Sequence, residues 1–402
     1  MAMQASTTRR GLLAGGAAAA VAGAALGTAR RSAAQRGGGE AVRIGLILPM
    51  TGPFASTGRQ VEAAVRAYLG ANGETFGGRR VELLVRDDTG VAPDITRRLA
   101  QELVVRERVR FLAGFGLTPL ALAAAPIATE AKVPMVVMAA ATSIIVQRSP
   151  YILRTSFTLP QATVPIADWA ARNGIRNCAT LVSDYAPGLD AERAFKERFT
   201  AAGGRVPLEL RAPLRNPDFA PFLQRVHDAK PEALFIFVPS GEGAAAMKQF
   251  AERGLREAGI RLIGTGDLTD DDILNDMGEP AIGVVTSHHY SAAHDSAENR
   301  AFLAAYRRVA PDVRPNFMAV GGWDGMHLIA EGLKRAGGGA SGDQLLAAMK
   351  GLSWTSPRGP ITIDANTRDI VQDIYIRRVE RRDGQLWNIE FDRIAQVRDP
   401  GT

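Results

Sequence analysis

Residues 42–60 read VRIGLILPMTGPFASTGRQ, a short apolar run followed by a loop of proline, glycine and hydroxyl residues and then by an amphipathic segment. The run 42–48 contains several β-branched residues and predicts a buried strand. Apolar residues at helical spacing follow over 58–69 and predict a helix. Strand, loop and helix in this order form the repeating unit of an α/β fold. The loop then lies at the carboxyl edge of the sheet, where ligands bind in open α/β sheets.

The same alternation of short apolar and longer amphipathic runs continues along the chain and predicts two α/β lobes, each a parallel sheet covered by helices. Expected strands lie at 42–48, 81–85, 109–113, 135–138, 178–182, 206–210, 233–238, 261–263 and 282–286. Expected helices lie at 58–69, 93–106, 120–131, 162–173, 189–201, 219–228, 243–253, 299–309, 317–335 and 343–349. The tail has strand-like segments at 361–363, 374–379 and 386–391.

Length and composition favour a globular protein of two or three domains, with 402 residues, 46% hydrophobic and 22% charged, and exclude a disordered, collagenous or multispanning chain. The formal charge of +6 has a local origin. Residues 1–34 hold four arginines and no acid, and the rest of the chain carries 44 basic against 42 acidic residues. A near-neutral body without a basic run gives little drive for nucleic-acid binding. The single cysteine, Cys178, excludes an intrachain disulfide and a multi-cysteine metal site.

Residues 1–34 have the features of a secretory signal. Paired Arg9 and Arg10 precede a weakly apolar run of alanine and glycine, and small residues stand before an expected cleavage site near Ala34. Paired arginines are typical of a twin-arginine signal, which exports folded proteins. The alternatives are an uncleaved disordered leader and a retained anchor; a lipoprotein anchor is excluded because no cysteine lies near the site. We therefore expect a soluble periplasmic product.

Small and hydroxyl residues fill the loops after the first, third and fourth expected strands, at 49–58, 114–119 and 139–143. Hydroxyls and the N–H groups of helix N-termini bind an anion such as a carboxylate without a formal positive charge. Taken singly, each loop also fits a helix cap or a turn. Three such loops on successive strands favour a ligand-binding cleft at the edge of the sheet.

Collinear segments over residues 41–391 resemble the periplasmic Leu/Ile/Val-type binding proteins of ABC transporters. These segments are 42–60, GGRRVEL (77–83), RDDTG (86–90), AAAPIA (123–128), KVP (132–134), AATS (140–143), YILRT (151–155), DF (218–219), EPAIGV (279–284) and YIRRV (375–379). The resemblance implies a clamp of the periplasmic-binding-protein type I, with two doubly wound lobes and three hinge crossings. It places the crossings near 154–157, 288–291 and 357–360. Lobe I then comprises 41–156 plus 290–356, and lobe II comprises 157–289 plus 357–398.

The resemblance also implies the ligand-binding residues. Those of lobe I are Phe54, Ala55, Thr118, Ala140, Thr142 and Ser143, and those of lobe II are Tyr185 and Ser240. Two further candidates, Asp267 and Tyr290, do not come from the family's pattern. Thr118 and Thr142 match the family's carboxylate-holding positions, and Ser143 is the alternative to Thr142 because this chain has one extra residue in that loop. Tyr185 matches the family's cleft tyrosine.

One position departs from the family pattern. Members that bind amino acids present an acid to the ligand's ammonium group where this chain has Gly266, with Asp267 one place later. If the side chain of Asp267 turns into the cleft, an amino acid fits. If it caps the following helix, the ligand is an aliphatic or aromatic carboxylate, with Phe54, Tyr185 and Tyr290 as apolar or stacking contacts.

We therefore expect a monomeric, non-enzymatic solute receptor of an ABC importer that captures a small amino-acid-type ligand and docks on the membrane permease. The alternatives are a receptor for an aliphatic or aromatic carboxylate or an amide without an α-amino group, and a ligand-sensing clamp domain. The sequence contains no G-x-S-x-G or P-loop motif, and Gly114-x-Gly116 after the third expected strand lacks the third glycine of G-x-G-x-x-G; we expect no cofactor.

A metal site is the remaining chemical alternative. His288, His289 and His294 with Asp270–Asp272 are its best candidates. We expect no metal, because adjacent histidines in a strand point to opposite faces. The acidic run Asp270–Asp272 is expected to be the solvated N-terminus of a helix.

Overall fold

The computed structural model describes residues 40–401; residues 1–39, which hold the predicted export signal, and Thr402 lie outside the described residues. The sheet of lobe I has the strand order β2-β3-β1-β4-β5-β6 and is parallel except for β2, which pairs antiparallel with β3. Its strands are β1 (Val42–Leu48), β2 (Thr75–Phe76), β3 (Arg79–Asp87), β4 (Phe111–Gly114), β5 (Met135–Val137) and β6 (Ile152–Arg154).

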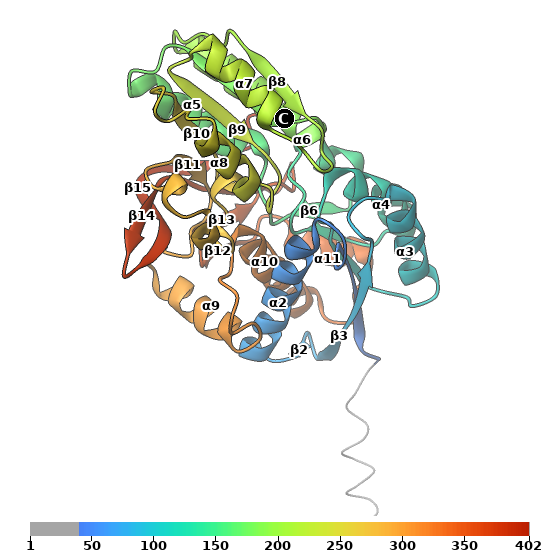
Figure 1. Cartoon of the computed structure of the whole chain (residues 1–402). Coiled ribbons are helices and arrows are strands. Elements are labelled where there is room, and N and C mark those ends of the chain that lie inside the picture. Colours follow the sequence, from blue (N-terminus) through green and yellow to red (C-terminus); the bar gives the residue numbers. More distant parts are fainter. Residues whose placement is uncertain (1–39, 402) are drawn as a thin grey trace, which may run out of the picture. The chain divides into compact units, whose positions relative to one another are not determined.

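Helices from two distant parts of the sequence complete lobe I. They are α2 (Ala55–Asn72), α3 (Pro93–Val105), α4 (Thr118–Ala131), α9 (Ala297–Arg307), α10 (Phe317–Ala336) and α11 (Gly342–Met349). Helices α2 and α10, which lie far apart in the sequence, pack side by side (Figure 1). Helix α2 begins close to the loop that follows β1, and Gly58 is required there because a Cβ at this position would collide with the carbonyl group of Pro49. This close approach fixes the loop before α2.

The sheet of lobe II has the strand order β12-β13-β14-β11-β10-β9-β7-β8, and β15 pairs with β14. Its strands are β7 (Cys178–Ser183), β8 (Glu209–Ala212), β9 (Ala233–Phe237), β10 (Arg261–Thr265), β11 (Val285–His288), β12 (Ser353–Ser356), β13 (Gly359–Ile363), β14 (Ile370–Arg382) and β15 (Gln385–Val397). Its helices are α5 (Leu159–Arg172), α6 (Ala186–Ala201), α7 (Ala220–Ala229) and α8 (Gly243–Glu252). The strands from β7 to β11 are parallel, whereas β14 joins β11 antiparallel. The predicted fold of two α/β lobes is confirmed.

The chain crosses between the two sheets after β6, after β11 and before β12. Strand β12, which we assigned to lobe I, pairs with β13 in the second sheet. It also contacts lobe I, because Nε1 of Trp354 donates a hydrogen bond to Oδ1 of Asp324 on α10, at 3.0 Å. The hairpin of β12 and β13 therefore lies at the junction of the lobes. The residue-level division of the chain between the lobes stays a prediction.

Several expected elements differ from those observed. Strands β2, β6 and β12 were not predicted, because runs of two to four residues carry too little periodicity to be read from sequence. Helices α2, α5 and α6 each begin three residues earlier than expected, and β8 lies at Glu209–Ala212 rather than at 206–210. No helix in residues 40–401 is long and apolar enough to cross a membrane.

The expectation that Asp270–Asp272 is a solvated helix N-terminus is wrong. The run lies between short 3-10 helices at Gly266–Thr269 and Leu274–Met277, and Asp270 and Asp271 are buried. Burial raises the pKa of Asp270 well above its ordinary value, and the neighbouring Asp272 carboxylate raises it further. The acidic run is therefore part of the interior between the lobes, which local sequence does not reveal.

Candidate functional site

A pocket lies between the carboxyl ends of strands from both sheets. Apolar and aromatic side chains form most of its wall: Phe54, Leu117, Ala139, Ala140, Ala141, Phe157, Leu159, Tyr185, Pro187, Phe237, Pro239 and Met318. The polar side chains in the lining are Thr57, Thr118, Ser240 and Asp267. A concave, mainly apolar pocket with a few polar groups is the usual form of a small-molecule site.

The wall from lobe I combines one aromatic ring with hydroxyl and amide donors. Phe54 comes from the loop before α2, and Thr118 begins α4. No side chain caps α4 at Leu117, but Pro119 has no N–H and the N–H groups of Leu120 and Ala121 bond to the carbonyl oxygen of Leu117, so the backbone N–H left at this end is that of Thr118. The hydroxyl of Thr142 lies 2.7 Å from that of Thr118, so each can orient the other. The Thr118 N–H and the two hydroxyls suit an anion.

The wall from lobe II is aromatic with one acid. The rings of Tyr185 and Phe237 stack with centroids 6.2 Å apart and an interplanar angle of 15°. Burial and the nearby carboxylate of Asp267 raise the pKa of Tyr185, which keeps its hydroxyl protonated. Ser240 faces the pocket, but its hydroxyl donates a hydrogen bond to the carboxylate of Asp270 behind the wall. Asp267 is 3% exposed and belongs to the pocket lining, and its Oδ2 accepts a hydrogen bond from the hydroxyl of Thr265.

The predicted site residues differ in where they lie relative to the pocket. Those in the pocket lining are Phe54, Thr118, Ala140, Tyr185, Ser240 and Asp267. Thr142 lies directly behind Thr118. Ala55, Ser143 and Tyr290 are not in the lining: Ala55 begins α2, the hydroxyl of Ser143 is directed at Asp399, and Tyr290 is fully buried with its hydroxyl 3.0 Å from Oδ1 of Asn299.

Eleven lining residues were not among the predicted ligand-binding residues: Thr57, Gly116, Leu117, Ala139, Ala141, Phe157, Leu159, Pro187, Phe237, Pro239 and Met318. Phe237 is the last residue of β9. Ligands bind at the carboxyl ends of strands, and the same rule that indicated the loops of lobe I therefore also indicates Phe237 in lobe II. Phe157 lies in the predicted first crossing. Met318 comes from α10, far along the chain from the other lining segments. No sequence motif around it indicates a ligand site.

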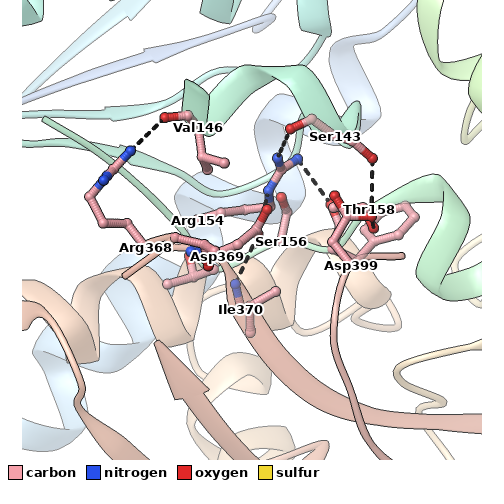
Figure 2. Close-up of polar contacts among 12 residues, drawn as sticks. Ser143, Val146, Arg154, Ser156, Thr158, Arg368, Asp369, Ile370 and Asp399 are labelled. Atoms are coloured by element: carbon pink, nitrogen blue, oxygen red, sulfur yellow. Dashed lines mark hydrogen bonds and ion pairs between the residues drawn. The ribbon is translucent and has the colours of Figure 1, made fainter. Parts of the chain in front are cut away.

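A buried ion pair supports the loop of Thr142 from behind, as Figure 2 shows. Arg154 at the end of β6 is fully buried, and its Nε lies 2.8 Å from Oδ1 of Asp369. Its Nη2 donates to the carbonyl oxygen of Thr142 at 2.9 Å, and its Nη1 to that of Ala140 at 3.3 Å. On the same side, Asp399 accepts hydrogen bonds from the hydroxyls of Ser143 and Thr158. These contacts join the site loop to the first crossing and to the C-terminal segment.

A second set of contacts joins the lobes beside the pocket. The hydroxyl of Ser56 on α2 donates a hydrogen bond to Oδ2 of Asp272 at 2.6 Å. Nδ2 of Asn316 donates to Oδ2 of Asp270 at 3.1 Å. Residues 40–401 contain no group of three or more His, Cys, Asp and Glu side chains that could hold a metal ion.

Two α/β lobes with the chain crossing between them and a lined pocket at their interface define a ligand-binding clamp. The periplasmic binding protein family model matches residues 41–385, and the chain belongs to this family. It is the solute-binding protein of an ABC transporter, and its family places it in the periplasm as a binding protein rather than an enzyme.

Known relatives agree with this assignment. The "Leu/Ile/Val-binding protein homolog 6" of Brucella melitensis biotype 1 is 43% identical over 92% of this chain and 95% of its own length. A solute-binding protein of an ABC transporter from Rhodopseudomonas palustris BisB5, solved with 3,4-dihydroxybenzoic acid, is 61% identical with a TM-score of 0.88 over 90% of this chain and 99% of that chain. Another from Rhodopseudomonas palustris HaA2, solved with p-hydroxybenzoic acid, is 40% identical with a TM-score of 0.88 over the same shares of the two chains.

Proposed function

We propose that this protein captures an aromatic carboxylate in the cleft between its lobes and delivers it to an ABC permease. The observation that carries the proposal is the composition of the pocket wall, in which aromatic side chains of both lobes meet around few polar groups. Phe54 and Phe157 belong to the same lining as the stacked pair Tyr185 and Phe237. A planar ring would pack among them, since aromatic pairs gain about 0.5–1.5 kcal/mol beyond the area that they bury.

The carboxylate end of the ligand fits lobe I. The N-terminus of α4 and the hydroxyl pair of Thr118 and Thr142 are oriented donors. No arginine or lysine belongs to the lining drawn from residues 40–401, so these neutral donors would hold the charge. The ligands bound by the two Rhodopseudomonas palustris proteins have this chemistry, a ring with one carboxylate.

An α-amino acid is the second candidate ligand. The specific observation in its favour is Asp267, whose carboxylate lies in the pocket wall and could receive an ammonium group. The family also contains the Leu/Ile/Val-type relatives. The aromatic lining argues against this candidate, because an aliphatic side chain does not require so many aromatic rings around it.

Calorimetry decides between the candidates. We expect 4-hydroxybenzoate and 3,4-dihydroxybenzoate to bind tightly and leucine to give no heat. Thr142→Val should weaken binding of the aromatic acids by about 1.5–3 kcal/mol, because it removes a hydrogen bond near the ligand's charge. Ser240→Ala should weaken it less, because that hydroxyl is donated to Asp270. Tight binding of leucine without binding of any benzoate would refute the proposal, and unchanged affinity in Thr142→Val would remove this residue from the site.

Ligand binding should close the lobes, and the contact between Ser56 and Asp272 should stabilise the closed form. Ser56→Ala is expected to lower ligand affinity by about tenfold, because a hydrogen bond to a carboxylate is lost in the closed form alone. Thr96→Val is the matched control, since it removes a hydroxyl bonded to Asp88 within lobe I. Small-angle scattering measures the closure. An unchanged radius of gyration at saturating ligand, or equal affinity losses in the two variants, would contradict this prediction.

Export and docking complete the proposed function. The arginine pair in residues 1–34 supports the twin-arginine route. We propose that the folded chain works in the periplasm as a monomer, carries no cofactor and docks on the membrane permease.

A further inference from the structure

The carboxylate of Asp267 is held from one side. Its Oδ2 accepts a hydrogen bond from the hydroxyl of Thr265 at 2.9 Å and lies 3.5 Å from Nε2 of His288. Among the residues that the structure describes, no donor bonds to the other oxygen, Oδ1. A buried carboxylate oxygen without a donor loses its hydration without compensation. Because Asp267 lines the pocket, a bound ligand can supply the missing donor.

The tautomer of His288 follows from its second contact. The backbone N–H of His289 donates to Nδ1 of His288 at 3.0 Å, so Nδ1 is an acceptor. Burial lowers the pKa of His288 to about 4, although Asp267 acts in the opposite direction, and the ring is therefore neutral near pH 7. A neutral ring that accepts at Nδ1 carries its proton on Nε2, which faces Asp267. The hydroxyl of Thr265 thus holds Oδ2, and Nε2 of His288 lies 3.5 Å from the same oxygen without a hydrogen bond.

Gly266 explains why the acid stands at 267. A Cβ at Gly266 would collide with the guanidinium group of Arg377 and the ring of His288, so no acidic side chain fits where amino-acid-binding relatives are expected to have one. Arg377 is itself buried, and its Nη1 lies 4.0 Å from Oδ2 of Asp271. Lobe II therefore offers the ligand one carboxylate oxygen, Oδ1 of Asp267. It stands one residue after the position at which the family pattern has its acid.

The number of donors on the ligand distinguishes the two possible partners of this oxygen. An ammonium group has three N–H donors and needs several acceptors when buried, whereas a hydroxyl has one. The rest of the lobe II lining is mainly aromatic and apolar, with Tyr185 as a donor and Ser240 bonded to Asp270. A single neutral donor at the far end of a ring matches this wall better than an ammonium group does.

We propose that Oδ1 of Asp267 accepts a hydrogen bond from a ring hydroxyl of the bound aromatic acid and so makes the cleft selective for hydroxylated over unsubstituted benzoates. The inference rests on the proposed function, because it assumes that the carboxylate of the ligand is held by lobe I. It assigns the two ends of the ligand to different lobes, so a hydroxylated acid bridges the closed clamp.

The test compares 4-hydroxybenzoate with 4-fluorobenzoate, which has a similar size and no donor, by calorimetry. We expect the wild-type protein to prefer 4-hydroxybenzoate by about 10- to 150-fold, as a hydrogen bond to a charged group implies. In Asp267→Ala the preference should fall below about threefold, and in the isosteric Asp267→Asn it should be intermediate. Asp228→Asn, which removes an exposed acid of the same lobe, is the charge-matched control and should keep the full preference.

The outcomes separate the inference from the proposed function. Equal binding of both acids by the wild-type protein, or an unchanged preference in Asp267→Ala, overturns the inference and leaves the proposed function standing. Binding of leucine without binding of either acid overturns both. The comparison within the wild-type protein needs no variant, so a misfolded Asp267→Ala would not prevent the decision.

Discussion

Arg154→Met is expected to lower the free energy of unfolding by about 3–5 kcal/mol, because removing one partner of a buried ion pair leaves the other charge uncompensated. Arg154 is fully buried, and its partner Asp369 is almost so. Burial raises the pKa of Asp369, and Arg154 opposes this rise. Denaturant unfolding measures the loss. The exposed pair of Arg97 and Asp94 is the control, and Arg97→Met should cost less than about 1 kcal/mol.

The same variant should also weaken ligand binding. Arg154 donates to the carbonyl oxygens of Ala140 and Thr142, which belong to the loop behind the expected carboxylate site (Figure 2). Without these bonds the hydroxyl of Thr142 loses its fixed orientation toward Thr118. Arg154→Met combined with Asp369→Leu should recover part of the stability, because an apolar pair can replace a buried ion pair. Wild-type affinity in Arg154→Met would show that the ion pair has no part in positioning the site.

Arg358→Met is expected to cost a similar 3–5 kcal/mol of unfolding free energy for the same physical reason. Arg358 is fully buried against Asp324 of α10, with Nε 2.9 Å from Oδ2. Its guanidinium group also donates to the carbonyl oxygens of Thr155 and Ser156 in the first crossing, at 2.5 and 3.0 Å. The side chain therefore ties the turn between β12 and β13 to the first crossing.

Within residues 40–401, none of the hydrogen bonds and ion pairs of Arg358 reaches the site loop at 139–143, so its removal should leave ligand affinity of the folded protein within about threefold of wild type. This separates it from Arg154, which has equal burial and a comparable ion pair. Unfolding and calorimetry on both variants make the comparison. If Arg358→Met lost affinity as strongly as Arg154→Met, the hinge as a whole would control binding and the assignment of Arg154 to the site loop would be wrong.

Most of the repeating architecture was predictable from the sequence. The apolar run 42–48 forms β1, the amphipathic run 317–335 forms α10, and the alternation between them gives two α/β lobes. Such elements are predictable because side-chain periodicity follows from local backbone geometry. Helix starts were less predictable: α5 begins at Leu159 because Thr158 and Gln161 form a capping box, and the apolar periodicity becomes clear only later.

The site was predictable in part. Thr118, Tyr185 and Asp267 follow strand ends or match family positions, and all three line the pocket. Ser143 and Tyr290 also follow strands of the two sheets. Their hydroxyl groups, however, bond to Asp399 and Asn299, which are not in the pocket lining. Position along the chain does not determine on which side of a loop a side chain lies, because that depends on partners from distant segments.

The sequence by itself determined the lobes, their helices and the family, because these depend on short-range periodicity and on motifs in fixed order. Only the tertiary structure decided that Asp270 and Asp271 are buried, that Ser56 reaches Asp272 and that His288 from the next strand lies beside Asp267. Each of these contacts joins residues that are distant in sequence or lie on neighbouring strands. Buried polar groups must find partners wherever the fold brings them, and that requirement is satisfied in three dimensions.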